Sequence, residues 1–180
     1  MMQVTDNALA QSDFEAIRNT LFSEQFPWYY NPTVLYEQVC SPYLDVPPSS
    51  RLEFLQCDDL DNFQFTHGFV YRGKINSSAN DVLEPLYDFL EVRSLYRVKA
   101  NMNPRSQNIV VHGRHLDTAW DDAKVAILYV TTDDGFTIFA DGTKVESVAN
   151  RILQFPSTMG HSGSTCTTGK VRVVVNVIYF

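Results

Sequence analysis

The sequence KVAILYVTTDDGFTIFADGTKVESVANRILQF, residues 124–155, decides the fold class. Its apolar residues recur with the period of two that is typical of β-strands, and short polar segments interrupt them. Asp134-Gly135 and Asp141-Gly142 are dipeptides that favour hairpin turns between such runs. Several short strands joined by tight turns indicate an all-β sandwich or barrel.

The same period continues on both sides of this stretch. One further strand is predicted in the first half of the chain, at Phe63–Tyr71. From residue 95 onward seven strands are predicted, at Leu95–Met102, Gln107–His115, Lys124–Thr131, Phe136–Ala140, Lys144–Val148, Arg151–Phe155 and Lys170–Phe180. We therefore predict a mainly β protein, a double-stranded β-helix (jelly roll), with buttressing N-terminal helices.

Two helices are predicted before the β-rich half. Ser12–Glu15 has the pattern of a capping box, and Phe14, Ile17 and Leu21 follow on one helical face. A second helix is predicted to begin near Asn80 or Asp81. It presents three leucines at helical spacing, Leu83, Leu86 and Leu90. The stretch between the helices, residues 27–48, is rich in turn residues and is expected to be irregular.

Length and composition favour one globular domain. The chain has 180 residues, of which 44% are hydrophobic and 19% are charged, and these values fit a protein with a sizeable core. We expect a single domain over residues 1–180. Residues 1–93 would form a helical and irregular support region, and residues 94–180 would form most of the jelly-roll core.

Charge and cysteine usage exclude several classes of protein. The net charge of -7 argues against binding to a phosphate backbone, which needs a basic surface. The three cysteines show no CxxC spacing, so neither a disulfide framework nor a zinc site is expected. The first ten residues lack the pattern of a signal peptide, and no apolar run is long enough to cross a bilayer. The expected location is the cytoplasm.

A candidate metal site is formed by His115-Leu116-Asp117 and the distant His161. Side chains at positions i and i+2 of a strand point the same way, so His115 and Asp117 can reach one ion together. Two imidazoles and one carboxylate on one side of the metal are typical of non-haem Fe(II) oxygenases. Two other histidines compete as ligands. His112 is expected to face the opposite side of its strand, and His67 to be a hydrogen-bonded core or cleft residue.

The last strand carries a candidate anion-binding residue. Alternation places Arg172 on one face together with Val174, Asn176 and Ile178. A guanidinium on an apolar strand needs a partner, and the carboxylate of a dicarboxylate cosubstrate suits its geometry. The alternatives are an internal Asp or Glu as partner, an exposed position for Arg172, or Lys170 in the same role.

Two further groups of residues are open to more than one interpretation. Tyr129 can donate a second hydrogen bond to the carboxylate that Arg172 holds, or it can be an ordinary core tyrosine. The polar residues Arg97, Lys99 and Asn101 share one face of a strand. They are expected to form a solvated sheet face, with a pocket mouth as the alternative.

These residues together resemble a known family. His115-Leu116-Asp117, the segments ILYVTTDDGFTIF (residues 127–139) and ANR (149–151), His161 and Arg172 are similar to the 2-oxoglutarate/Fe(II) oxygenase superfamily. The nearest resemblance is to its prolyl-4-hydroxylase-like branch, which includes small phage-encoded members. It covers about residues 94–180. The chain departs from the pattern in having a single glycine, Gly135, before Thr137, and a slightly long interval between His161 and Arg172.

The resemblance implies an activity and a role for each residue. His115, Asp117 and His161 would be the catalytic iron ligands, and Arg172, Tyr129 and Asn176 would bind 2-oxoglutarate. The implied enzyme is a dioxygenase that uses Fe(II), 2-oxoglutarate and O₂, with ascorbate in support, to hydroxylate a C–H bond and release succinate and CO₂.

The resemblance leaves the substrate open. A prolyl or other side chain of a protein or peptide is the first expectation, with a small molecule next. Oxidation or demethylation of a nucleic-acid base by the same chemistry, or a non-catalytic jelly-roll binding module, are the alternatives. If the gene is from a phage, the location would be the host cytoplasm.

Overall fold

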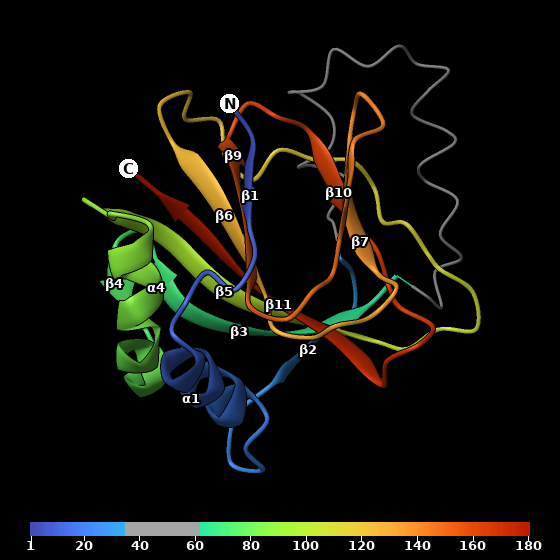
Figure 1. The fold of residues 1–180 in the computed structure, drawn as a ribbon, viewed down its shortest axis with the longest axis horizontal. Helices are drawn as coiled ribbons and strands as arrows, with labels where there is room; N and C mark the ends of the chain where they lie inside the picture. Colours follow the sequence, from blue (N-terminus) through green and yellow to red (C-terminus); the bar gives the residue numbers. More distant parts are fainter. Residues whose placement is uncertain (35–61) are drawn as a thin grey trace.

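The computed structural model describes residues 1–34 and 62–180, and its strands form two antiparallel sheets that face each other (Figure 1). The larger sheet has the order β1-β9-β6-β11-β5-β3-β2, with β4 paired to β3. These strands are β1 (Gln3–Thr5), β2 (Tyr29–Asn31), β3 (Gln64–Tyr71), β4 (Lys74–Ile75), β5 (Leu95–Pro104), β6 (Lys124–Tyr129), β9 (Arg151–Pro156) and β11 (Val171–Tyr179). The smaller sheet has the order β10-β7-β8, formed by β7 (Phe136–Phe139), β8 (Lys144–Glu146) and β10 (His161–Gly163).

The alternation of side chains along the central strands creates two cores. On β6, Val125, Ile127 and Tyr129 point toward the smaller sheet and pack with Phe139 and Phe155. The intervening residues of β6 and β11 pack on the other face, against the helices. Because both faces of β6 are covered, this strand is apolar on both sides after Lys124. The predicted mainly β jelly roll is confirmed.

The helices cover the outer face of the larger sheet (Figure 1). They are α1 (Gln11–Leu21), a 3₁₀ helix η1 (Ser78–Leu83) and α4 (Glu84–Phe89). The apolar residues predicted to face the core are buried: Phe14, Ile17, Leu21, Leu83, Leu86 and Leu90. In the part of the chain that the structure describes, no helix combines the length and the hydropathy that a membrane span requires.

The predicted capping box at the start of α1 is wrong. The helix begins at Gln11, with Ala10 as its N-cap, and no side chain caps it. Ser12 therefore lies inside the first turn, where its hydroxyl contacts Asp13 instead of a free backbone N–H. The second predicted helix exists, but its first part is 3₁₀. Pro85 lies in the first turn of the α-helical part, where its missing N–H costs no hydrogen bond.

Two predictions in the β-rich half are also wrong. Residues 107–115 do not form a regular strand, since only isolated bridges, Val111 to Ser164 and His115 to His161, join them to their neighbour. The Thr165 hydroxyl accepts from the backbone N–H of Val110 and so interrupts the ladder. Residues 134–135 are not a hairpin turn, because the strands that they connect, β6 and β7, belong to different sheets.

Four short strands, β1, β2, β4 and β10, were not expected from the sequence. Asp141-Gly142 does form the predicted hairpin, between β7 and β8, and Gly142 adopts a φ of 85° that favours glycine. Cys166 is a buried free thiol. Cys40 and Cys57 lie outside the described residues.

Candidate metal centre and adjoining pocket

The two candidate histidine ligands lie opposite each other on neighbouring chain segments. The backbone N–H of His115 donates to the carbonyl of His161, and the N–H of His161 donates to the carbonyl of His115, both at 3.0 Å. This reciprocal pair places the two imidazole rings side by side, with centroids 4.6 Å apart. The irregular segment that leads to His115 is thus held in register with β10 at the position of the two histidines.

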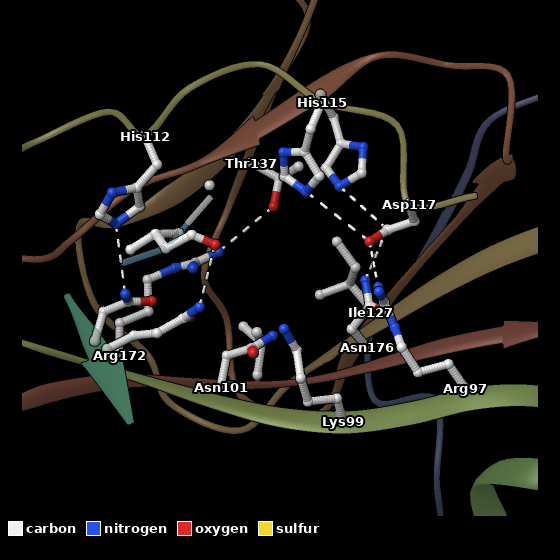
Figure 2. A pocket seen from close by; sticks show the side chains of 16 residues that line it. Arg97, Lys99, Asn101, His112, His115, Asp117, Ile127, Thr137, Arg172 and Asn176 are labelled. Atoms are coloured by element: carbon white, nitrogen blue, oxygen red, sulfur yellow. Dashed lines mark hydrogen bonds and ion pairs between the residues drawn. The ribbon is translucent and has the colours of Figure 1, made fainter. Parts of the chain in front are cut away.

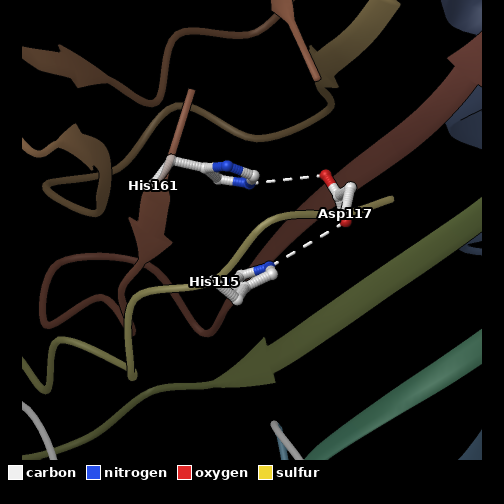
Figure 3. Close-up of side chains that lie close together, drawn as sticks. All are labelled: His115, Asp117 and His161. Carbon is white, nitrogen blue, oxygen red and sulfur yellow. Dashed lines mark ion pairs between the residues drawn. The ribbon is translucent and has the colours of Figure 1, made fainter. Parts of the chain in front are cut away.

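Asp117 completes the cluster (Figure 3). Its two carboxylate oxygens lie 3.9 Å from His115 Nε2 and 3.5 Å from His161 Nε2. One ligand atom from each residue lies within 4.8 Å of the others. An ion with bonds of about 2.0–2.2 Å fits between atoms at this spacing. The structure therefore brings together the three residues that the sequence singles out.

The orientation of both imidazoles suits a metal. His115 Nδ1 donates to the carbonyl of Gly113 at 3.2 Å, and His161 Nδ1 donates to that of Met159 at 3.4 Å. With Nδ1 bound to a carbonyl, each ring turns its Nε2 toward Asp117 and leaves that nitrogen as the atom available to a metal. Burial, followed by the neighbouring His161, lowers the pKa of His115 to about 4, so this ring is neutral at pH 7. The sequence could not identify these acceptors because they are backbone atoms.

Two neighbours hold Asp117 in its ionised form. Arg97 Nη2 donates to one carboxylate oxygen at 2.5 Å, and Asn176 Nδ2 donates to the other at 3.0 Å. Burial opposes ionisation, but the charge of Arg97, with smaller contributions from the two histidines, keeps the pKa of Asp117 well below its usual range. A pre-oriented carboxylate and two imidazoles that turn Nε2 toward it form a donor set that fits a divalent transition metal.

Arg172 lies in the same pocket, on the side away from the metal cluster (Figure 2). Its side chain is buried, with 3% of the residue exposed. It donates to three neutral acceptors, the hydroxyls of Ser147 and Thr137 and the carbonyl of Ser164. No carboxylate of residues 1–34 or 62–180 forms an ion pair with it. Of the alternatives for Arg172, both an exposed position and an internal Asp or Glu among these residues are therefore excluded.

The other candidate anion-binding residues are placed differently. Tyr129 lies beneath Arg172, whose guanidinium carbon is 5.6 Å from the centre of the tyrosine ring. Its hydroxyl donates to Thr137 Oγ1 at 2.8 Å, so it reaches the pocket through Thr137. Lys170 is exposed and lies outside the pocket, near α1. Asn176 lines the pocket, but its contacts are with Asp117 and Arg97.

The prediction that Arg97, Lys99 and Asn101 form a solvated sheet face is wrong. All three line the pocket, because β5 is covered on this face by the smaller sheet and the segment before Asp117. Burial, followed by the charge of Arg97, lowers the pKa of Lys99 to about 8. Lys99 is therefore largely protonated at pH 7.

The prediction for His112 is also wrong. It lines the same pocket as His115, because the segment that carries both is not a regular strand, and its Nε2 contacts Asn103 Nδ2 at 3.4 Å. His67 has the role predicted for it, since its two ring nitrogens bond to the carbonyl of Pro27 and the hydroxyl of Ser77. Thr137 and Asn103 were not predicted as pocket residues. The alternation of β7 and β5 is the only sequence signal for them.

Gly135 is needed for Arg172 to occupy its place. A Cβ at this position would lie 2.4 Å from Arg172 Cδ and 2.8 Å from the carbonyl oxygen of Thr165. We expect Gly135→Ala to lower the free energy of unfolding by about 1–3 kcal/mol, because the surrounding groups must shift. Urea unfolding measures this. Gly68→Ala is the matched control, since no atom lies within 4 Å of its added methyl. Equal stability of the two variants would contradict the steric argument.

Comparison with known proteins relies on structure. No family model matches the sequence, and no curated protein matches it. A prolyl hydroxylase from Trichoplax adhaerens, in complex with a hypoxia inducible factor oxygen degradation domain peptide, matches with a TM-score of 0.65 and 12% identity, over 99% of this chain and 83% of that one. A prolyl-4-hydroxylase from Pseudomonas putida matches with a TM-score of 0.59 and 14% identity, over 99% and 91%.

A third structure, an oxidoreductase of the 2OG-Fe(II) oxygenase family from Burkholderia pseudomallei, matches with a TM-score of 0.52 and 14% identity, over 66% of each chain. These proteins share little sequence with this chain, so the likeness concerns the arrangement of the backbone. Together with the jelly roll described above, it shows that the chain has the fold of the 2-oxoglutarate/Fe(II) oxygenases.

Proposed function

We propose that this protein is an Fe(II)- and 2-oxoglutarate-dependent dioxygenase that hydroxylates a C–H bond of its substrate. One observation carries the proposal. A cluster of two imidazoles and one ionised carboxylate shares a pocket with a buried arginine that forms no ion pair with any described carboxylate. A metal-binding dicarboxylate would complete both halves of this pocket at once.

Each residue has a defined task in this proposal. His115, Asp117 and His161 would hold Fe(II) on one side and leave its other positions open. Arg172 would bind the distal carboxylate of 2-oxoglutarate, and Thr137, which contacts both Arg172 and Tyr129, would support it. Bound together, Fe(II) and 2-oxoglutarate would supply the activation of O₂, with succinate and CO₂ as co-products, and ascorbate would keep the iron reduced.

The apolar wall of the pocket has a task of its own. Ile127 and Val174 line the pocket that contains the metal cluster and Arg172. They are 5% exposed each and limit the access of water to the reacting groups. We propose that residues 1–180 act as one domain, since strands from both ends of the chain enter the larger sheet that supports this pocket.

The substrate proposed first is a prolyl or other side chain of a protein or peptide. The fold shared with two prolyl hydroxylases, one of them bound to a peptide, supports this choice. Oxidation of a nucleic-acid base is disfavoured by the net charge of -7.

The direct test of the activity is aerobic turnover. Purified protein is incubated with Fe(II), 2-oxoglutarate, ascorbate and a mixture of peptides, and succinate and the gain of one oxygen atom by a peptide are followed by mass spectrometry. We expect succinate to form in the wild type and not in His161→Ala. If Fe(II) is bound and no succinate forms, with or without peptides, the protein is a non-catalytic metal-binding module.

Asn176 provides a finer test of the metal site. Asn176→Leu keeps the number of heavy atoms and the branching of the side chain but removes the hydrogen bond to Asp117. We expect the affinity for Fe(II) to fall by about 10–100-fold, as is typical when a group that orients a metal ligand is lost. Anaerobic equilibrium dialysis measures it. Asn80→Leu, a change at a buried asparagine that bonds Tyr87 instead, controls for general destabilisation. Unchanged affinity in folded Asn176→Leu would show that Asn176 does not support the ligand.

A further inference from the structure

The pocket keeps a net positive charge even when the proposed metal and cosubstrate are bound. Among the described residues that line it, Asp117 is the only acidic one, whereas Arg97, Lys99 and Arg172 are basic. Asp117 is paired with Arg97. Lys99 forms no ion pair with any carboxylate of residues 1–34 or 62–180. A partly buried ammonium without a counter-ion is costly, so this lysine calls for an explanation.

Lys99 lies beside the metal cluster. On β5 it is paired with Asn176 of β11, the residue that donates to Asp117. Figure 2 shows Lys99 and Asn101 pointing from β5 into the space between Arg172 on one side and Asp117 on the other. The side-chain oxygen of Asn101 is buried and has no hydrogen-bond partner among residues 1–34 and 62–180. Two polar groups of the pocket floor, an ammonium and an amide, are thus available to a bound molecule.

The charges of the loaded pocket do not balance in the proposed function, on which this inference rests. Fe(II), Asp117 and the dianion 2-oxoglutarate together leave one negative charge. The three basic residues exceed it by two positive charges. A neutral prolyl residue within a peptide would leave that excess in place, close to the metal and screened little by water. An anionic substrate would reduce it.

We propose that the substrate carries a carboxylate close to the carbon that is oxidised, and that the ammonium group of Lys99 binds it. The Asn101 oxygen can accept a hydrogen bond from a donor on the same molecule. A carboxylate of this kind belongs either to a free organic or amino acid or to an acidic side chain within a peptide. Lys99 is then a specificity-determining residue, and it favours an acidic substrate over a neutral peptidyl proline.

The test measures binding rather than turnover. The protein is loaded with Mn(II), which takes the same kind of ligands, and with excess 2-oxoglutarate. Two pairs of small ligands are then compared, and the members of each pair differ only in charge. N-acetylproline and N-acetylprolinamide represent free acids. A short peptide with one internal aspartate and the same peptide with asparagine at that position represent acidic peptides. Broadening of ligand proton signals by the paramagnetic Mn(II) in NMR spectra reports binding next to the metal.

We expect at least one acid to bind at least about 30-fold more tightly than its neutral counterpart, as is typical when a buried charge finds its partner. The arm in which this occurs distinguishes a free acid from an acidic peptide. Lys99→Met should remove the preference and Lys99→Arg should keep it. Lys74→Met, at an exposed lysine of β4, should leave it unchanged.

Three results would overturn the proposal: the proton signals of no acid are broadened, the neutral ligands bind as tightly as the acids, or Lys99→Met keeps the preference for acids. If Lys99→Met instead loses 2-oxoglutarate, the ammonium binds the cosubstrate and the proposal is equally wrong. Failure of the wild type to retain Mn(II) and 2-oxoglutarate would reject the proposed function itself, and this inference with it.

Discussion

Asp117→Asn is expected to reduce the affinity for Fe(II) more than the roughly 10–100-fold typical for loss of a group that only supports a ligand. The amide is neutral and a poorer metal ligand, and it no longer offsets the charge of Arg97. Fe(II) would then have to bind next to an uncompensated guanidinium. Anaerobic equilibrium dialysis with Fe(II) gives the affinity, and circular dichroism shows whether the variant is folded.

The matched control is Asp141→Asn. Asp141 is an exposed turn residue whose carboxylate accepts from the backbone N–H of Thr143, far in the sequence from the metal cluster. It should bind Fe(II) as the wild type does. A folded Asp117→Asn protein with wild-type affinity would remove the carboxylate from the ligand set.

Arg172→Leu is expected to weaken the binding of 2-oxoglutarate roughly a hundredfold, which corresponds to about 2.7 kcal/mol. The reason is that the ligand carboxylate loses a buried, two-pronged partner and faces only neutral hydroxyls. The affinity of Arg172→Lys for 2-oxoglutarate should lie between those of the wild type and Arg172→Leu, because lysine keeps the charge but not the planar fork. Isothermal titration of the Mn(II)-loaded protein measures the affinity, and retention of Mn(II) shows that the metal site is intact.

Lys170→Met is the control variant that decides which basic residue binds the carboxylate. Lys170 is two residues from Arg172 in the sequence, yet it is exposed outside the pocket. We expect it to bind 2-oxoglutarate normally. If Lys170→Met lost the cosubstrate while Arg172→Leu retained it, the assignment of the anion-binding residue would have to be reversed.

The fold class and the proximity of His115 to Asp117 were predictable because their signals are local. The period of two in β6 and β11 shows which side chains share a face, and the structure places Arg172, Val174 and Asn176 on one face as expected. The pairing of His115 with Asp117 depends only on a spacing of two residues. The approach of His161 required the strand order of a jelly roll, which the hairpin pattern suggested.

The rest depended on contacts between distant segments. The polar face of β5, with Arg97 and Lys99, has the pattern of a solvated strand, and only the three-dimensional packing shows that other chain segments cover it. His112 was misplaced because a regular strand was assumed where Thr165 interrupts the ladder. The carbonyl groups that orient His115 and His161 leave no trace in the sequence at all.

The most direct test of the central claim is an anaerobic titration of the protein with Fe(II) and 2-oxoglutarate, followed by visible absorption. Chelation of the metal by the cosubstrate produces a weak metal-to-ligand charge-transfer band. We predict this band in the wild type, its loss in His115→Ala, and a requirement for much more 2-oxoglutarate in Arg172→Leu. Absence of the band in a wild-type protein that does not retain iron would contradict the assignment of an oxygenase site.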